Sequence, residues 1–240
     1  MDNHFDTIIW GPSLTGIQKA IELKRKGQKV LLAGKFGFPG GKATESLASL
    51  FRLQDLNGSG FYKRFFEEVK QLQHSVLFRN QYWVLLHPEA VKRVCWEMLA
   101  AEDIDLLFHV VPLDVGYKHD LFELQLFGKE GEIMLTAGDV IDESNDWLLS
   151  KMKGKTGYQN LQINAFFSGS LPFDMSGFHV TRRLQTSIGT YFSTSVKHVP
   201  NKDVEKTFNR ELDRLSKETW KMSGARILMV PVFPEITAVK

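Results

Sequence analysis

The sequence contains only one cysteine, Cys95, among its 240 residues. One cysteine cannot form a disulfide framework within the chain, and because Cys95 stands in a segment with helical spacing, we expect a core residue rather than a redox centre. Long apolar runs are also missing, and the first residues, Met1 to His4, carry no basic flank. We therefore expect neither a secretory signal nor a membrane span, with a cytoplasmic location as the default.

An excess of charge of one sign is equally absent. Lysine and arginine total 30 and aspartate and glutamate total 28, so the net charge is +2. No basic block with interleaved aromatic residues occurs, which gives no electrostatic case for binding nucleic acid or an anionic membrane. The seven histidines do not have the spacing of metal ligands, and we expect no metal site.

The stretch from Asp6 to Thr44 is the most informative part of the sequence. An apolar run ends at Gly11, a short turn leads to Gly16, an amphipathic segment continues to Lys26, and a second apolar run covers residues 30–33. This order predicts strand, glycine turn, helix and strand, which is the start of a dinucleotide-binding βαβ unit. In such a unit the turn lets the backbone approach a pyrophosphate, and the helix N-terminus attracts it.

The glycine fingerprint G-x-G-x-x-G is incomplete in this turn. Its three glycine positions hold Gly11, Ser13 and Gly16, so the middle glycine, which admits the pyrophosphate, is replaced. The acidic residue that holds the ribose hydroxyls is also missing, because the second apolar run continues into Gly34. Loss of that carboxylate is expected to weaken binding by about one to two powers of ten. Lys35 provides an alternative, in which a cation in place of the carboxylate selects a different nucleotide.

The segment from Gly34 to Thr44 resembles the exit of the second strand in FAD-dependent oxidoreductases of the glutathione-reductase-like flavoprotein group. Relatives in that group carry a G-F-x-G-G-x-A-T motif along the flavin, and the same pattern is present from Gly37 to Thr44. Two further segments are similar to the family. The helix and strand before Val111 resemble those that pass the adenine, which implies a backbone contact at Val111. Ser144 and Asn145 stand where the family's D-A-T-G-D segment has a threonine and a glycine against the cofactor.

The resemblance implies that FAD is the cofactor and that its ligands come from these segments. The expected cofactor-binding residues are Gly11, Ser13, Leu14, Thr15, Gly16, Gly34, Lys35, Gly40, Gly41, Ala43, Thr44, Val111, Ser144 and Asn145. No catalytic acid or base is identified from the sequence.

The fold class that we expect is α/β: a Rossmann-like βαβ FAD-binding domain with a β-meander over residues 1–150, and a smaller antiparallel α+β domain of the substrate type over residues 151–240. In the first domain, helical spacing predicts helices over residues 60–73 and from Pro88, whereas residues 45–60 read as irregular. A strand at residues 105–111 precedes the meander, whose strands are predicted at residues 110–115, 121–127 and 132–136, followed by a separate buried strand at residues 140–142.

Residues 151–155 read as a basic connector between the two domains. In the second domain the pattern predicts strands at residues 161–167, 178–186 and 189–199, a helix over residues 203–222 and a last strand at residues 226–232.

Two functions from different classes follow from these features. The first is an FAD-dependent oxidoreductase-like flavoprotein that acts on a small molecule. The second is a non-catalytic flavoprotein-fold subunit, or pseudoenzyme, that binds a partner chain. It rests on the absence of the family's usual C-terminal segment that covers FAD, which would leave apolar surface for a homo- or hetero-oligomer to bury.

Overall fold

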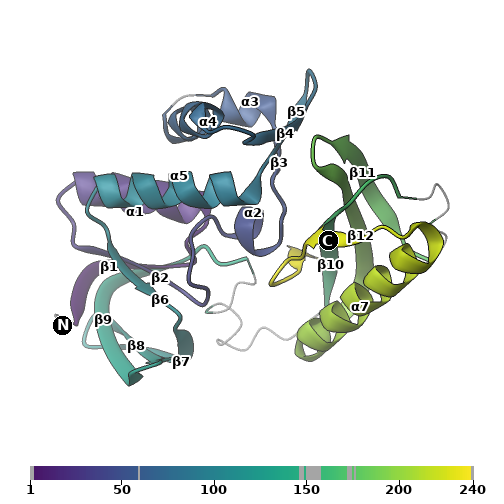
Figure 1. Cartoon of the computed structure of the whole chain (residues 1–240). Helices are drawn as coiled ribbons and strands as arrows, with labels where there is room; N and C mark the ends of the chain where they lie inside the picture. The colour runs from purple at the N-terminus through teal and green to yellow at the C-terminus, as the bar shows by residue number, and fades with distance from the viewer. Residues whose placement is uncertain are drawn as a thin grey trace. The chain divides into compact units, whose positions relative to one another are not determined.

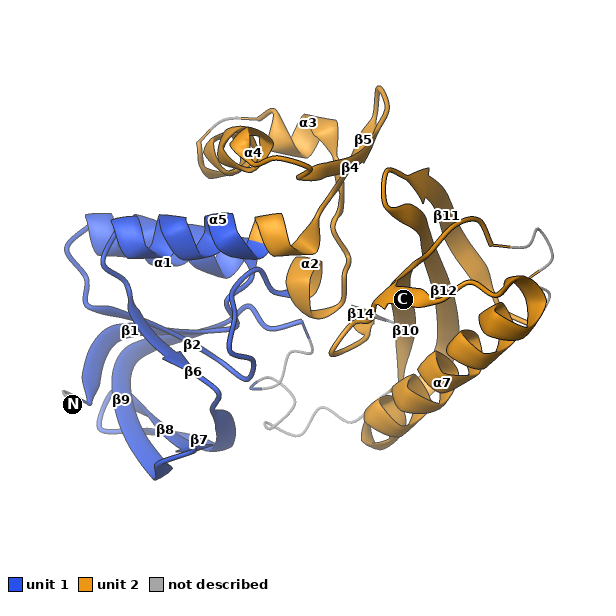
Figure 2. Cartoon of the chain, viewed as in Figure 1, with its two compact units in different colours: residues 1–41, 92–155 blue, residues 42–91, 156–240 orange. Residues whose placement is uncertain are grey.

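The computed structural model describes residues 3–58, 60–145, 149, 158–171, 175 and 177–238. Its contacts divide the chain into two compact units, residues 1–41 with 92–155 and residues 42–91 with 156–240 (Figure 2). The chain therefore leaves the first unit after Gly41 and returns to it at Lys92. The domain boundary near residue 150 stays a prediction, and the connector expected at residues 151–155 lies outside the described residues.

The first unit is built on a six-stranded sheet with the strand order β6-β2-β1-β9-β8-β7. Strand β1 pairs in parallel with β2, as Thr7 with Val30, and with β9, as Ile8 with Val140. The βαβ order expected at the start of the sequence is therefore confirmed. The strands are β1 (His4–Trp10), β2 (Val30–Gly34), β6 (Asp105–Phe108), β7 (Val111–Lys118), β8 (Leu121–Gly128) and β9 (Gly131–Asp142).

Two helices, α1 (Leu14–Arg25) and α5 (Pro88–Ala101), run along one side of the parallel strands (Figure 1). Helix α1 buries Ile17, Ala20 and Ile21, which recur at the helical period and form one apolar stripe. The helix expected from Pro88 is confirmed as α5, and its buried face consists of Val91, Val94, Cys95, Met98 and Leu99, all inaccessible or nearly so.

The meander consists of β7, β8 and the first half of β9, and its apolar face packs against the parallel strands. Leu124, Leu126 and Leu135 belong to the same core cluster as Ile8 and Trp10. The expectation of a separate strand at residues 140–142 is wrong. Strand β9 continues without a break from the meander into the parallel sheet, because residues 136–142 pair directly with β1.

The second unit contains a five-stranded antiparallel sheet in which β11, β12, β10 and β13 follow one another and β14 also pairs with β10. A long helix, α7, follows a short 3-10 turn, η1 (Asn201–Asp203), and its Leu215 shares a core cluster with Phe167 and Phe192. The strands and helix are β10 (Tyr158–Phe167), β11 (Val180–Thr186), β12 (Gly189–Pro200), α7 (Val204–Ser223), β13 (Ile227–Met229) and β14 (Glu235–Ala238).

Two sequence predictions for the second unit need correction. The last strand is not residues 226–232: β13 is shorter, the amide of Val232 bonds instead to the carbonyl of Glu45, and β14 follows. Residues 45–60 are not irregular either, since they contain β3 and α3. The helix expected over residues 60–73 is confirmed. These elements are α2 (Lys42–Glu45), β3 (Leu50–Arg52), α3 (Leu53–Leu56), α4 (Phe61–Gln71), β4 (Val76–Arg79) and β5 (Trp83–Leu86), and β3, β5 and β4 form a separate three-stranded sheet.

Candidate functional site

The candidate site of the first unit lies where three parallel strands end. Strands β2, β1 and β9 are neighbours and end at Gly34, Trp10 and Asp142. The carboxyl edge of an open parallel sheet is where α/β proteins of this type bind ligands. The loops that leave these strands contain most of the residues expected to bind the cofactor.

The turn between β1 and α1 is held by both neighbouring strands. The amide of Gly11 donates to the carbonyl of Ala33 at 2.8 Å, and the amide of Glu143 donates to the carbonyl of Trp10 at 2.7 Å. Gly11 has a φ of +104°, and an added Cβ would lie 2.5 Å from the α-carbon of Ser144. Glycine is therefore required at residue 11 for two reasons: the backbone is left-handed there, and the loop after β9 approaches too closely for a side chain.

Gly16 and Ser13 fix the start of α1. A Cβ on Gly16 would overlap the carbonyl oxygen of Gly11, so this glycine lets the helix pack closely on the end of the strand, as the third glycine of the fingerprint does. Ser13 is the N-cap, and its hydroxyl accepts the amide of Gly16 at 3.0 Å. The serine in the place of the middle glycine thus uses one of the helix's unpaired amides.

The second glycine motif packs against this turn. Gly40 forms an isolated parallel bridge with Ser13, and its amide donates to the carbonyl of Pro12 at 2.7 Å. Gly41 has a φ of +53°, and a Cβ there would lie 2.7 Å from the α-carbon of Ser13. The structure therefore brings both glycine motifs together. Leu14 is 93% buried in α1, and Thr15 is exposed.

Gly34 occupies the end of β2, the position at which a ribose-binding carboxylate was expected. A Cβ on Gly34 would lie 2.7 Å from Cδ of Pro12, so the proline ring takes the space of a side chain at residue 34. The Nζ of the next residue, Lys35, lies 5.6 Å from the centre of the Phe36 ring. The use of Lys35 for a different nucleotide stays a prediction.

The segment between the two glycine motifs packs on the loop that follows β6. A Cβ on Gly37 would overlap the imidazole of His109, and the rings of Phe36 and Phe38 are stacked with centres 5.9 Å apart. The amide of Val110 donates to the carbonyl of Gly34 at 3.3 Å. Val111, predicted to contact adenine, begins β7 next to this loop with a partly exposed side chain.

The segment after β9 carries an acidic side chain, Glu143, directly before Ser144 and Asn145, the two positions that are similar to the family motif. The amide and hydroxyl of Ser144 donate to Asp142 Oδ1 at 3.1 and 2.6 Å, and Asn145 follows, half-buried. Glu143 forms an ion pair of 2.5 Å with Lys19 of α1. The Cβ of Glu143 lies 3.4 Å from where a Cβ of Gly16 would be, so this pair lies beside the start of α1.

Ala43 and Thr44 belong to the second unit, in α2. Both are buried, and Lys42 accepts the amides of Ser46 and Ala48 at 3.1 and 3.0 Å through its carbonyl. The motif residues thus span the point at which the chain passes from one unit to the other. Whether they contact FAD stays a prediction.

A buried polar network in the second unit was not anticipated from the sequence. The Asn164 amide group is fully buried and donates to the carbonyl of Ser46 at 2.9 Å, and its oxygen accepts the hydroxyl of Ser193 at 2.6 Å. The Glu235 carboxylate accepts from Gln162 at 2.8 Å and from Asn164 at 3.3 Å. An asparagine on the buried face of a strand pattern is the sequence signal that points to such a network.

Two buried titratable groups, one in each unit, are poorly suited to reaction at neutral pH. The Tyr191 hydroxyl donates to the carbonyl of Leu47 at 3.2 Å, and burial raises its pKa. In the first unit, burial likewise raises the pKa of the Cys95 thiol, and Cys95 is a core residue, as expected from the sequence.

Among the described residues, no group of three or more histidine, cysteine, aspartate or glutamate side chains is arranged to hold a metal ion. None of the helices in the described ranges has both the length and the apolar character that crossing a membrane requires.

Comparison with known proteins identifies relatives of this fold. The model of the family "FAD dependent oxidoreductase" matches residues 6–227. No curated protein matches the sequence.

Three solved structures illustrate the similarity. The anhydrotetracycline hydroxylase OxyS from Streptomyces rimosus is 13% identical with a TM-score of 0.60, over 97% of this chain and 52% of the hydroxylase. The p-nitrophenol 4-monooxygenase PnpA from Pseudomonas putida is 14% identical with a TM-score of 0.60, over 98% and 68% of the two chains. A geranylgeranyl bacteriochlorophyll reductase-like protein from Thermoplasma acidophilum is 10% identical with a TM-score of 0.63, over 99% and 67%. The chain spans about half the length of the hydroxylase.

Proposed function

The chain belongs to the FAD-dependent oxidoreductase family, and on that premise we propose that it binds FAD at the carboxyl edge of its parallel sheet and takes part in an oxidoreduction of a small molecule. The observation that carries the proposal is the packing of the two glycine motifs: Gly40 and Gly41 lie against Ser13, at the N-terminus of α1. One motif would hold the diphosphate and the other would lie along the flavin.

The residues of the turn fit a diphosphate. Gly11 and Gly16 keep the close approaches of the first and third fingerprint glycines, and α1 directs its positive dipole end to the turn. Three features reduce the expected affinity: Ser13 takes the amide of Gly16, Pro12 excludes a side chain at Gly34, and Glu143 places a carboxylate near the same helix end. The Lys19 ammonium offsets the charge of Glu143. We therefore propose weak, reversible binding of FAD.

Bound flavin supplies hydride and electron transfer, while the protein supplies position and electrostatics. In this chain the described residues of the turn would bind and orient the diphosphate. The buried network around Asn164 would fix the Glu235 carboxylate in the second unit, where Lys42 Nζ lies 4.0 Å from its other oxygen. For the substrate we propose a small molecule and no narrower class.

Titration of the purified protein with FAD, followed by flavin absorbance and fluorescence, tests this proposal. We expect saturable binding that weakens about tenfold or more in Thr15→Glu. Thr15 is exposed in the first turn, so an added carboxylate suits the helix dipole and preserves the fold while it repels a diphosphate. The matched control is Thr181→Glu, which changes an exposed threonine of the edge strand β11 in the other unit, and it should leave the affinity unchanged.

The proposal fails if the wild-type protein takes up no FAD, or if Thr15→Glu binds as tightly as the wild type. Gly16→Ala provides a second variant, because its Cβ would displace α1 from the strand end. Gly116→Ala is its control, since a Cβ there meets no atom within 4 Å.

A second candidate function is a non-catalytic subunit of the same fold. The three affinity-reducing features favour it, as does a group of exposed apolar side chains on the meander that a partner chain or a second copy could bury: Val111, Leu113, Tyr117, Phe127 and Met134. Light scattering tests this candidate. A complex that forms without FAD would support it, and a monomer that binds FAD and captures no partner would contradict it.

We also propose a cytoplasmic location. The single cysteine is buried, and the near balance of charges gives no attraction to an anionic membrane. Fractionation of cells that express the chain tests the location.

A further inference from the structure

The second unit has a hollow whose lining includes none of the residues assigned above to FAD. It has a volume of about 370 Å³ and is lined by Arg52, Gln54, Gln81, Tyr82 and Trp83. This volume is within the range of small-molecule sites. The lining combines one cation, two aromatic rings and two amides.

The backbone around the hollow is fixed by a small antiparallel sheet. Arg52 of β3 lies opposite Trp83 of β5 in the strand register. The amide of Leu53 donates to the carbonyl of Tyr82 at 2.8 Å. The side-chain oxygen of Asn80 accepts the amides of Tyr82 and Trp83 at 2.9 and 2.8 Å. The lining side chains therefore project from a hydrogen-bonded frame rather than from a free loop.

The cation of the hollow is held by stacking and not by an acid. The guanidinium carbon of Arg52 lies 5.6 Å from the centre of the Trp83 ring, in a cation–π contact. Among the described residues, no carboxylate forms an ion pair with Arg52, whose guanidinium contacts the Trp83 ring instead. A guanidinium that rests on a ring keeps the N–H groups at its edge available for a planar anion.

The other side chains of the hollow determine which group a ligand would carry besides its anion. Tyr82 is 66% exposed, which is unusual for a large aromatic side chain and offers a flat surface to a ring. Gln54 and Gln81 add neutral donors and acceptors at the rim. We propose that this hollow binds a small aromatic carboxylate, with the carboxylate on Arg52 and the ring against Tyr82 and Trp83.

Benzoate is a suitable probe, with calorimetry and the change in total tryptophan fluorescence as readouts and without added FAD. We expect saturable binding of benzoate that is weakened about tenfold or more in Arg52→Gln, because this variant removes the charged donor of the hydrogen bonds to the carboxylate. Arg52→Lys should also bind benzoate less tightly, since it keeps the charge but loses the planar guanidinium that can donate two hydrogen bonds to one carboxylate. The control Arg64→Gln removes an exposed arginine that pairs with Glu68 on α4 and should bind as the wild type does.

Two further probes separate the contributions. Benzamide, which has the ring without the charge, and inorganic phosphate, which has the charge without the ring, should each bind about tenfold more weakly than benzoate. The proposal is overturned if benzoate does not bind, if Arg52→Gln binds it equally well, or if either probe matches it. Because FAD is not present, these results are independent of the proposed flavin site.

Discussion

The α-carbon of Gly34 faces the ring of Pro12 so closely that an added Cβ would lie 2.7 Å from Cδ of the proline. Gly34 ends β2, where a dinucleotide-binding unit is expected to carry its ribose carboxylate. The missing carboxylate and the proline in the glycine turn are thus one feature of the molecule, because the proline ring fills the space that a side chain would need.

The contact between Pro12 and Gly34 predicts how a ribose-binding carboxylate can be restored. Gly34→Glu alone should lower the melting temperature, since its Cβ meets the proline. The double variant Pro12→Ala with Gly34→Glu should fold normally and bind FAD about tenfold to a hundredfold more tightly than Pro12→Ala alone, as a carboxylate regains the ribose hydroxyls. Thermal unfolding and flavin titration measure the two effects. Equal FAD affinities of Pro12→Ala and of the double variant would contradict the prediction.

The cap that Ser13 provides predicts opposite effects on stability and binding. Ser13→Gly should cost only a few tenths of a kcal/mol, whereas Ser13→Ala should cost about 1 kcal/mol. Ser13→Gly also releases the amide of Gly16, which Ser13 now bonds at 3.0 Å, and should tighten FAD binding by about tenfold. Urea unfolding and flavin titration measure both. An FAD affinity that does not change in Ser13→Gly would mean that this amide does not contact a phosphate.

The ion pair beside α1 predicts effects of opposite sign for its two members. Glu143→Ala removes a negative charge near the start of the helix and should tighten FAD binding by about fivefold, while Lys19→Gln leaves that charge uncompensated and should weaken binding by a similar factor. Because both side chains are partly exposed, stability should change by less than about 1 kcal/mol. The difference between the variants should shrink in high salt, and the same shift in both would be inconsistent with an electrostatic cause.

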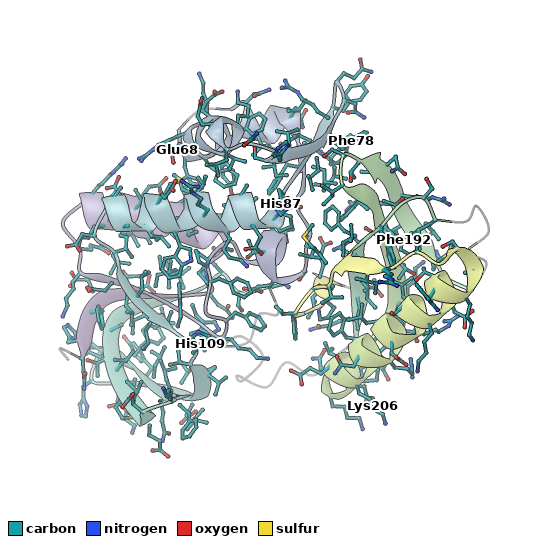
Figure 3. All side chains as sticks on the ribbon, in the orientation of Figure 1. Glu68, Phe78, His87, His109, Phe192 and Lys206 are labelled. Atoms are coloured by element: carbon teal, nitrogen blue, oxygen red, sulfur yellow. The ribbon has the colours of Figure 1, made fainter. Side chains whose placement is uncertain are left out.

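The pH dependence of stability should depend in part on His87, a residue of the second unit that directly precedes α5 (Figure 3). Burial lowers the pKa of His87, and the Glu89 carboxylate opposes this only partly. Its Nδ1 accepts the amide of Glu89 at 3.2 Å, a bond that suits the neutral ring. The unfolded chain, with a pKa of about 6.5, therefore takes up the proton first as the pH falls.

Proton linkage sets the direction of this effect on the free energy of unfolding. The stability that His87 contributes is fully present above about pH 6.5 and is lost as the pH falls through the lowered pKa of the folded state. His87→Gln should flatten this part of the curve of unfolding free energy against pH. His4→Gln, an exposed histidine on β1, is the control and should keep the slope. A wild-type slope that His87→Gln leaves intact would refute the assignment.

Local patterns were enough to predict the parts of the fold in which neighbours in sequence are neighbours in space. The βαβ start, α4, α5 and α7 have clear helical periodicity, and each of these helices buries one face. The small sheet β3-β5-β4 was missed because its strands have only three or four residues, and Leu50 pairs with Leu85, which is far away in the sequence. A pairing of that kind is fixed by tertiary packing and leaves little periodic signal.

The candidate site shows the same division. The glycine motifs could be found from their spacing, and the structure brings them together at Ser13. The close approach of Pro12 to Gly34 and the pair of Lys19 with Glu143 could not, because each joins side chains that meet only when the strands are aligned. The network around Asn164 likewise depends on the pairing of β10 with β12, which sets Asn164 opposite Ser193.

The most direct measurement of the central claim is the change in backbone amide NMR signals when FAD is added to the wild-type chain. If the two glycine motifs form the seat of the diphosphate and flavin, the largest changes should fall on the amides of residues 11–16 and 40–41, and they should be much smaller with riboflavin, which has no diphosphate. Changes that are confined to other residues, or equal changes with riboflavin, would contradict the account.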